Sequence, residues 1–364
     1  MPLINNIYYT KSELLKKCGK IDQVAGYKRY IFSEGKAKGV EAVDINNGNG
    51  LKFTVLLDRN MDIAFADFRG VNLSYITKNG IVAPQYYDKD ENEWLRSFIG
   101  GLLTTCGILN AGAASVDMGE KLGLHGRISN TPVDNVCCKS YWDGDEFFIE
   151  VSAQSHETKF FGEYLTLHRS IKVKAGENKI LLHDRIENEG YRSTPIMMIY
   201  HYNLGFPLVD EGSEIYINSD KWIPTSLESE KRMQDQFKVT SCEANAIENV
   251  YFHEFLENKK TGLAMLLNKK LMSNGIGVYI KFDLKELPYL NLWKMMGEGE
   301  YVIGLEPSNC MTLGRDKERE RGTLRYIKAG EVKDFKMEIG IIENVENIDV
   351  KKLEELINEN EMQE

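Results

Sequence analysis

Basic residues are the minority among the charged side chains of this 364-residue chain, with 45 Lys and Arg against 55 Asp and Glu and a formal net charge of −10. Proteins that hold nucleic acid or anionic lipid do so through a surplus of Lys and Arg, so neither partner is expected. No stretch approaches the roughly 18 apolar residues of a membrane span. The amino terminus also lacks the basic start and apolar run of a secretory signal. These absences predict a cytoplasmic protein without a membrane partner.

Motifs for metals, disulfides and nucleotides are also missing. The six cysteines form no Cys-x-x-Cys pair, and there is neither His-x-His nor His-Glu-x-x-His. The glycine-rich signatures of nucleotide binding and the Gly-x-Ser-x-Gly signature of a nucleophilic serine are absent. His168, Arg169, His183 and Asp184 lie in one predicted hairpin, where the simplest interpretation is a cross-strand charge cluster on the surface. The sequence thus predicts reduced cysteines and neither a metal nor a cofactor.

The chain does contain a succession of short runs rich in β-branched and aromatic residues, separated by turn dipeptides. For example, the runs 40–45 and 51–57 flank a turn at 47–50, which is typical of a β-hairpin. Helices are expected only near the ends, after the capping box Thr10-Lys11-Ser12-Glu13 and over 350–358. With about fifteen or more strands and so few helices, the pattern predicts an all-β fold, a large antiparallel sandwich.

We expect one domain over residues 1–364, because neither a linker-like change in composition nor an internal repeat interrupts the chain. Residues 1–25 would form an N-terminal helical extension and residues 347–364 a C-terminal helical tail. The glycine-rich segment Gly100–Gly107 is too apolar for a surface linker and predicts tightly packed backbone beside a pocket. The charged run Arg315–Arg321 is most simply a solvated loop.

Three segments carry a chemical signal, and the first is Leu122–Asn130. His125 lies there between Gly123 and Gly126, and Arg127 follows two residues later. With so little side-chain bulk, the backbone can approach a ligand closely while the imidazole and the guanidinium reach the same opening. The alternative interpretation is a histidine in a turn beside a surface arginine.

The other two segments are Ile199–Pro207 and Tyr301–Pro307. In a strand, His201 and Asn203 face one side while the neighbouring tyrosines face the other, which suits a sugar site; the alternative is a satisfied core histidine. Glu306 ends a hydrophobic strand, where it is either a partly desolvated base or an ion-pair partner. Two histidines, an arginine and a glutamate without a nucleophile or metal indicate a proton-transfer reaction.

At these segments the sequence resembles the aldose 1-epimerase (galactose mutarotase-like) superfamily, and most closely its DUF4432 group. The resemblance runs from about residue 25 to residue 345 and implies a large antiparallel β-supersandwich with a sugar in a cleft on one face. The segments that carry it are Arg59-Asn60-Met61-Asp62-Ile63, Gly100–Gly107, Leu124–Arg127, Tyr200–Pro207 and Leu305–Pro307.

The resemblance also implies roles for individual residues. His125 matches a histidine that helps to bind and polarise the sugar, His201 matches the general acid and Glu306 the general base. Arg127 stands where the better-known mutarotases have a glycine, and their sugar-binding aspartate has no recognisable counterpart. The substrate-binding candidates are then Arg59, His125, Arg127, Asn203 and Trp293. For Trp293 the alternative to a stacking face is core packing.

These roles predict an isomerase that interconverts sugar anomers by acid/base opening and reclosure of the ring, without a cofactor. Arg127 and Arg59 lead to the further hypothesis that the sugar is acidic or otherwise modified, because a guanidinium recognises anions bidentately. The alternatives are a non-catalytic carbohydrate-binding or sensing protein, and a polysaccharide lyase or glycosidase on a related sandwich. The expected partner is a small sugar, and a homo-oligomer is compatible with the sequence.

Overall fold

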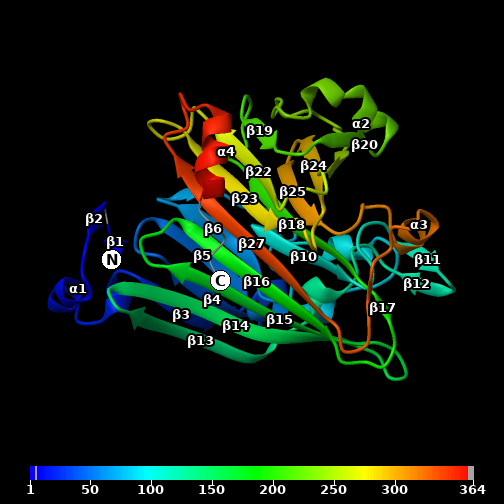
Figure 1. Cartoon of the computed structure of the whole chain (residues 1–364), viewed down its shortest axis with the longest axis horizontal. Coiled ribbons are helices and arrows are strands. Elements are labelled where there is room, and N and C mark those ends of the chain that lie inside the picture. Colours follow the sequence, from blue (N-terminus) through cyan, green and yellow to red (C-terminus); the bar gives the residue numbers. More distant parts are fainter. Residues whose placement is uncertain (5, 360–364) are drawn as a thin grey trace.

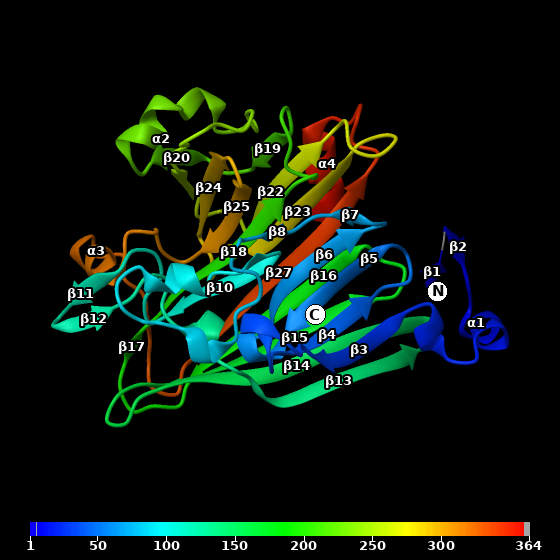
Figure 2. The ribbon, with the colours of Figure 1, turned by 180° about the vertical axis from the view of Figure 1, so that it is seen from behind.

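Two large antiparallel sheets packed face to face form the body of the molecule. The computed structural model describes residues 1–4 and 6–359. Figures 1 and 2, seen from opposite sides, show β14–β16 and β27 of one sheet on one side and β3–β6 of the other sheet on the opposite side. The predicted all-β antiparallel sandwich is thereby confirmed.

The larger sheet has 11 strands within the described residues. In spatial order its strands are β20 (Lys221–Pro224), β21 (Asn249–Glu254), β24 (Tyr289–Gly297), β25 (Glu300–Ser308), β18 (Met197–Gly205), β10 (Leu103–Ile108), β6 (Asp62–Phe68), β5 (Leu51–Leu56), β4 (Glu41–Asn46) and β3 (Gly26–Ile31), with β7 (Val71–Asn72) beside β6. The neighbours β18 and β25 come from segments a hundred residues apart in the sequence, so this order joins two of the three predicted signal segments.

The smaller sheet has eight strands in the described part of the chain. In order they are β13 (Asp134–Asp143), β14 (Glu146–Thr158), β15 (Tyr164–Lys174), β16 (Lys179–Asn188), β27 (Val332–Glu343), β23 (Ile276–Asp283), β22 (Thr261–Asn268) and β19 (Glu214–Ile217). Buried and more exposed residues alternate along β14, as in a sheet with one solvated face. By contrast, every residue of β18 is buried, because loops cover the outer face of the larger sheet there.

Short elements complete the chain. Two-stranded ribbons pair β1 (Leu3–Ile4) with β2 (Ile7–Tyr8), β8 (Tyr75–Ile76) with β9 (Gly100–Gly101), β11 (Ser115–Asp117) with β12 (Glu120–Leu122), and β17 (Thr194–Pro195) with β26 (Tyr326–Ile327). The α-helices are α1 (Lys11–Lys17), α2 (Leu227–Lys231), α3 (Arg315–Glu320) and α4 (Val350–Glu359). The 3-10 turns are η1 (Ile21–Gln23), η2 (Gly35–Ala37), η3 (Leu57–Arg59), η4 (Pro84–Tyr86), η5 (Glu93–Arg96), η6 (Ile128–Asn130) and η7 (Met233–Asp235).

The terminal helices form where the sequence indicates. Thr10 and Glu13 make the predicted capping box of α1, and α4 packs Leu353 and Ile357 against strands β22 and β23. The N-terminal segment also contains the β1–β2 ribbon, which was not expected, and residues 360–364 of the predicted tail lie outside the described residues. No helix in the described chain is long and apolar enough to cross a membrane.

The interpretation of the charged run 315–321 as a solvated loop is wrong. The run forms helix α3, whose Arg315 is buried and donates hydrogen bonds to Asp117 and Glu120 of the β11–β12 ribbon. These ion pairs hold the helix against the ribbon. In Figures 1 and 2, α3 and the ribbon lie at the opposite end of the molecule from α1.

Alternation along β18 separates two hydrophobic regions. Met198, Tyr200, Tyr202 and Leu204 belong to the large core between the sheets. Met197 and Ile199 belong instead to a smaller cluster on the outer face, which includes Trp94 and Phe98 from the covering segment 83–105. His201 and Asn203 share this outer face, as the strand period predicts.

Candidate active site

His201 and Glu306 meet on the outer face of the larger sheet. The register of β18 and β25 sets Asn203 opposite Gly304 and Tyr202 opposite Leu305, so His201 and Glu306 are cross-strand neighbours on one face. The distance from His201 Nε2 to Glu306 Oε1 is 3.1 Å. Both residues are deeply buried, with exposed fractions of 6% and 1%. Two titratable side chains from separate strands, β18 and β25, are therefore in contact.

Several polar atoms around this contact have no hydrogen-bond partner among the described residues. They are His201 Nδ1, Asn203 Oδ1 and Asn291 Oδ1, while Glu306 Oε1 has only its contact with His201 Nε2. Asn291, on β24, lies directly opposite Glu306, and its amide nitrogen donates to Ser308 and to the Cys310 carbonyl. Because a buried polar atom without a partner costs about 1–3 kcal/mol, a cluster of them is the expected environment of a polar ligand.

Burial determines the protonation of the pair. It lowers the pKa of His201 to about 3, with a further contribution from nearby His125, and it raises the pKa of Glu306 well above its ordinary value. At neutral pH the imidazole is therefore uncharged, and the carboxyl is held toward its protonated form.

Aromatic rings surround the pair. The His201 ring centroid lies 5.6 Å from that of Phe98, 5.3 Å from that of Trp293 and 5.8 Å from that of His125. The Trp293 indole donates a 2.8 Å hydrogen bond to Glu248, which fixes the ring. These rings make a largely apolar wall around two acid/base groups.

Gly304 allows Trp293 and Glu306 to come this close. It lies directly opposite Trp293 on β24. A Cβ atom at this position would stand 2.6 Å from Glu306 Oε1 and 3.0 Å from Trp293 Cβ. Only glycine fits without displacing one of these two side chains.

His125 lies in a left-handed turn (φ 56°) and faces the same region. Its Nδ1 accepts a 3.3 Å hydrogen bond from the Gly112 amide, so in the neutral ring Nε2 carries the proton. Burial lowers the pKa of His125 to about 4, which keeps the ring neutral. His125 is thus a fixed hydrogen-bond donor.

The chain is similar in sequence to a known protein family. A family model described as a domain of unknown function, DUF4432, matches residues 37–341. The chain belongs to the DUF4432 family. No curated protein sequence matches it.

Solved structures share the fold of this DUF4432 chain. A Klebsiella pneumoniae protein that carries the provisional name aldose 1-epimerase matches with a TM-score of 0.85 at 21% identity, over 94% of this chain and 91% of that one. A galactose mutarotase-like protein from Clostridium acetobutylicum has a TM-score of 0.62 at 15% identity, over 88% and 99%. A galactose 1-epimerase from Lactobacillus acidophilus has a TM-score of 0.56 at 14% identity, over 87% and 99%. These likenesses show a galactose mutarotase-like fold.

Arg59, a predicted substrate ligand in the DUF4432 signature, lies elsewhere. It is fully buried, and its guanidinium donates to the carbonyls of Ser129, Val82 and Ser97. Each guanidinium nitrogen already donates to a carbonyl, so Arg59 does not belong to the candidate site. It joins the covering segment to the turn that follows Arg127 and so positions the aromatic wall.

Arg127 does not join the His201–Glu306 contact either. Its side chain is about half exposed, and its Nε lies 3.4 Å from Oε1 of Glu157, a buried residue at the end of β14. Both residues line a separate cavity of about 970 Å³. The structure therefore brings together His125, His201, Asn203, Trp293 and Glu306, and places Arg127 beside another chamber.

Sequence reasoning missed Asn291, Trp94, Phe98 and Glu157. Asn291 could have been predicted, because it lies two residues before Trp293 in a strand and must share its face. Trp94 and Phe98 come from an irregular segment, for which the sequence shows no period. Glu157 looks like any other polar residue of an alternating strand.

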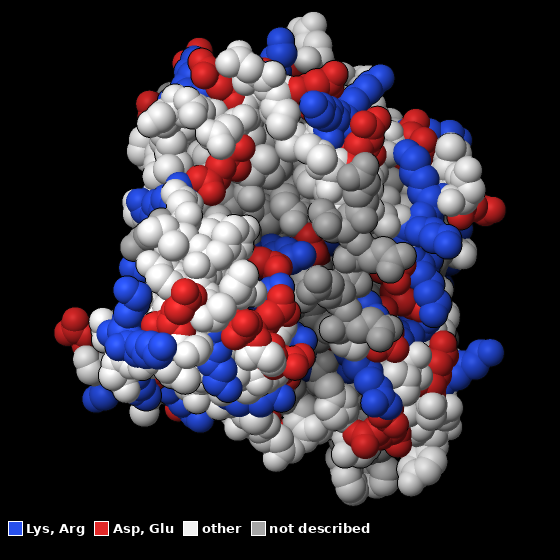
Figure 3. Space-filling model, turned by 60° about the vertical axis from the view of Figure 1, so that its left-hand side comes forward, with Lys and Arg blue, Asp and Glu red and all other residues white. Residues whose placement is uncertain are grey.

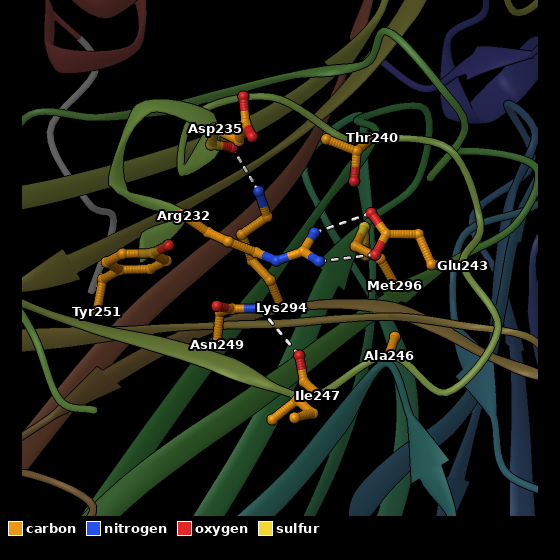
Figure 4. A pocket seen from close by; sticks show the side chains of 10 residues that line it. All are labelled: Arg232, Asp235, Thr240, Glu243, Ala246, Ile247, Asn249, Tyr251, Lys294 and Met296. Carbon is orange, nitrogen blue, oxygen red and sulfur yellow. Dashed lines mark hydrogen bonds and ion pairs between the residues drawn. The ribbon is translucent and has the colours of Figure 1, made fainter. Parts of the chain in front are cut away.

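Other charged regions are internally paired. The side chains drawn in Figure 4 line a small cavity. Its volume is only about 10 Å³, the space of one water. There the buried Lys294 ammonium donates to the Asp235 and Lys238 carbonyls, and Arg232 pairs bidentately with Glu243. Figure 3 shows a hollowed face on which acidic and basic side chains are intermixed. Within the described residues, no three His, Cys, Asp or Glu side chains are placed to hold a metal ion.

Proposed function

We propose that this protein is a sugar mutarotase, an isomerase that interconverts the α and β anomers of a sugar. The observation that carries the proposal is the contact between two buried titratable side chains, His201 and Glu306, beside buried polar atoms that have no partner among the described residues. The fold gives further support, because it is shared with proteins named as a galactose mutarotase-like protein and a galactose 1-epimerase.

The reaction needs one proton removed and one delivered. Glu306 takes the proton of the anomeric hydroxyl while His201 gives a proton to the ring oxygen. The bond between C1 and the ring oxygen breaks, and the sugar becomes an open-chain aldehyde. Rotation about C1–C2 and reclosure on the other face reverse both transfers. The pair holds one proton before and after the cycle, so no outside acid or base is consumed.

In the free site burial favours the uncharged forms, a protonated Glu306 and a neutral His201, whereas the reaction needs a carboxylate and an imidazolium. The bound sugar stabilises the charged forms of both groups. Hydroxyls that donate to Glu306 Oε1 stabilise its carboxylate, and a ring oxygen that accepts from His201 stabilises the imidazolium. The reactive protonation state therefore forms only with the sugar in place.

The surrounding groups orient the sugar. The Nε2–H of His125 donates to a sugar oxygen, and the free amide oxygens of Asn203 and Asn291 accept from hydroxyls. Trp293, held by Glu248, presents a ring edge or face to the sugar C–H groups. These contacts fix which oxygen meets which catalytic group.

A glycosidase is the second candidate, favoured by one observation. Glu248 lies against Trp293, and its charge contributes to the raised pKa of Glu306, so a second carboxylate lies within electrostatic reach of the first. Glycosidases use two carboxylates in this way. Release of free sugar from a nitrophenyl glycoside would favour this candidate over anomer exchange.

The test is α/β exchange measured by NMR across neutral, acidic and phosphorylated sugars. For the sugar that responds best, Glu306→Gln should lower the exchange rate by about 10²-fold or more, because the base is lost while shape is kept.

The matched control is Glu338→Gln. Glu338 is also a buried strand glutamate, with an exposed fraction of 2%, but it lies in the smaller sheet and bonds to Tyr279. This variant should exchange anomers at the wild-type rate. Normal exchange by Glu306→Gln would overturn the proposal.

A further inference from the structure

A second chamber lies beside the candidate active site. The cavity of about 970 Å³ is lined by residues 87–93, by β11 and β12, by the turn at 122–127 and by Glu157 from the other sheet. Small-molecule sites usually span about 300–1,000 Å³, so this one is at the upper end. His201 and Glu306 are not among its lining residues, and the proposed reaction leaves it unexplained.

Two polar side chains converge in this cavity. Glu157 has an exposed fraction of 3%, and its Oε2 has no hydrogen-bond partner among the described residues. Its other oxygen lies 3.4 Å from Arg127 Nε. Within the described chain the Arg127 guanidinium has only this ion pair with Glu157, so a donor and an acceptor stand side by side with further hydrogen-bonding capacity. Adjacent hydroxyls of a sugar can bond to both.

The charges of the lining do not favour an anion. They comprise three bases, Lys89, Lys121 and Arg127, and four acids, Asp90, Glu91, Glu93 and Glu157. Burial raises the pKa of Glu157 to about 7, with Arg127 opposing the shift, so this carboxyl donates or accepts near neutral pH. This balance of charges gives no support to the hypothesis of an acidic sugar bound by Arg127. An uncharged polyhydroxyl ligand suits this lining better.

The cavity adjoins the candidate active site. Gly107 and Gly126 line the cavity, and the Gly107 amide donates to the carbonyl of His125. The Tyr87 hydroxyl donates to the Gly126 carbonyl at 3.1 Å, which holds the tyrosine ring as a fixed apolar surface in the lining. His125 and Arg127 are two residues apart, so their Cα atoms are at most about 7 Å apart.

We infer that this cavity is a second carbohydrate subsite, which holds an uncharged ring next to the one that reacts. The substrate is then a neutral disaccharide or longer saccharide, with its reducing-end ring at His201–Glu306 and the next ring between Arg127, Glu157 and Tyr87. The inference rests on the proposed function, since that function defines which ring reacts.

The experiment compares maltose, cellobiose and lactose with glucose and galactose. Binding is measured by calorimetry on the wild type and on Glu306→Gln, and anomer exchange by NMR. At least one disaccharide should bind at least about tenfold more tightly than either monosaccharide, and Glu306→Gln should keep this preference. Arg127→Met and Glu157→Gln should each reduce the disaccharide-to-monosaccharide ratio of kcat/KM by about tenfold.

Arg185→Met is the matched control. Arg185 is also a half-exposed arginine with one carboxylate neighbour, Glu187, and it should leave the ratio unchanged. If no disaccharide binds more tightly than the monosaccharides, the inference is wrong and the mutarotase proposal stands. If disaccharide binding depends on Arg127 and Glu157 but no sugar is exchanged, the subsite stands and the proposed function is wrong.

Discussion

Strand β18 separates two buried polar clusters that share one backbone and differ in how completely their atoms are paired. On the inner side, Arg169 donates to both oxygens of Asp184, to Asp62 and to Thr105, at distances of 2.6–3.1 Å. Tyr200, on β18, donates to Asp184 at 2.8 Å. The inner cluster is a closed network in which each charge faces an opposite charge.

On the outer side of the same strand, His201 and Glu306 share a single contact and leave polar atoms unpaired. Burial is nearly the same for the two clusters. Depth and titratable side chains therefore do not identify a site, because both clusters have them. The two clusters differ instead in the polar atoms around the His201–Glu306 contact for which the fold itself provides no partner.

The largest effect is expected from opening the inner network. Arg169→Met leaves Asp62 and Asp184 buried without their cation, and it should lower the free energy of unfolding by about 3–5 kcal/mol. Denaturation with urea measures this change. Arg185→Met, at an exposed arginine, should change it by less than about 0.5 kcal/mol. A loss of similar size from both variants would show that the closed network does not contribute the expected stability.

On the outer side the expected loss is in activity instead. His201→Asn should lower kcat by about 10²-fold, equivalent to about 2.7 kcal/mol of activation free energy, because the proton donor is lost. KM should change much less, since other groups hold the sugar. The control, His183→Asn, removes a surface histidine paired with Asp334 and should be neutral. An unfolded His201→Asn protein would show that the outer pair is structural after all.

A smaller effect is expected from the glycine between these groups. Gly304→Ala adds a Cβ that forces Glu306 or Trp293 to move, and it should cut kcat/KM by about tenfold, or about 1.4 kcal/mol. Gly299→Ala is not a matched control, because its φ of 75° strains any side chain. Gly19→Ala is suitable, since a Cβ there meets nothing within 4 Å. Wild-type activity in Gly304→Ala would show that the close approach is unimportant.

The strand period accounts for much of what the sequence predicted correctly. It set His201 and Asn203 on one face and the tyrosines on the other, and this arrangement is observed. The segment Gly100–Gly107 is tightly packed as expected, since a Cβ at Gly107 would lie 2.0 Å from the Met197 carbonyl oxygen. Such features depend on local backbone geometry, which the residue pattern of a sequence indicates.

The strand period does not tell which face of a strand is buried. This explains why the predicted surface charge cluster was partly wrong. Arg169 and Asp184 are indeed cross-strand neighbours, but they point into the core, whereas His168 and His183 are exposed. The surface interpretation was therefore wrong for half of that cluster. The surroundings of Arg59 and Arg127 could not be predicted for a similar reason, because their partners are backbone carbonyls and a glutamate distant in the sequence, which no local pattern reveals.

The smallest predicted effect concerns pH and distinguishes the two members of the outer pair. Glu306 has a raised pKa in the folded state, so above its unfolded value of 4.5 the folded state binds more protons and the free energy of unfolding falls as pH rises. His201 acts oppositely: its pKa of about 3 lies below the unfolded value of 6.5, so its contribution is fully present above pH 6.5 and is lost as pH falls. In the wild type the two slopes oppose each other between pH 4.5 and 6.5.

Glu306→Gln should therefore gain stability relative to the wild type as pH rises, by up to about 1.4 kcal/mol per pH unit. His201→Asn should lose stability relative to the wild type over the same pH range. Urea denaturation at about pH 5 and 6 measures both slopes, and a pH-independent difference for either variant would show that its group is not buried in the form described.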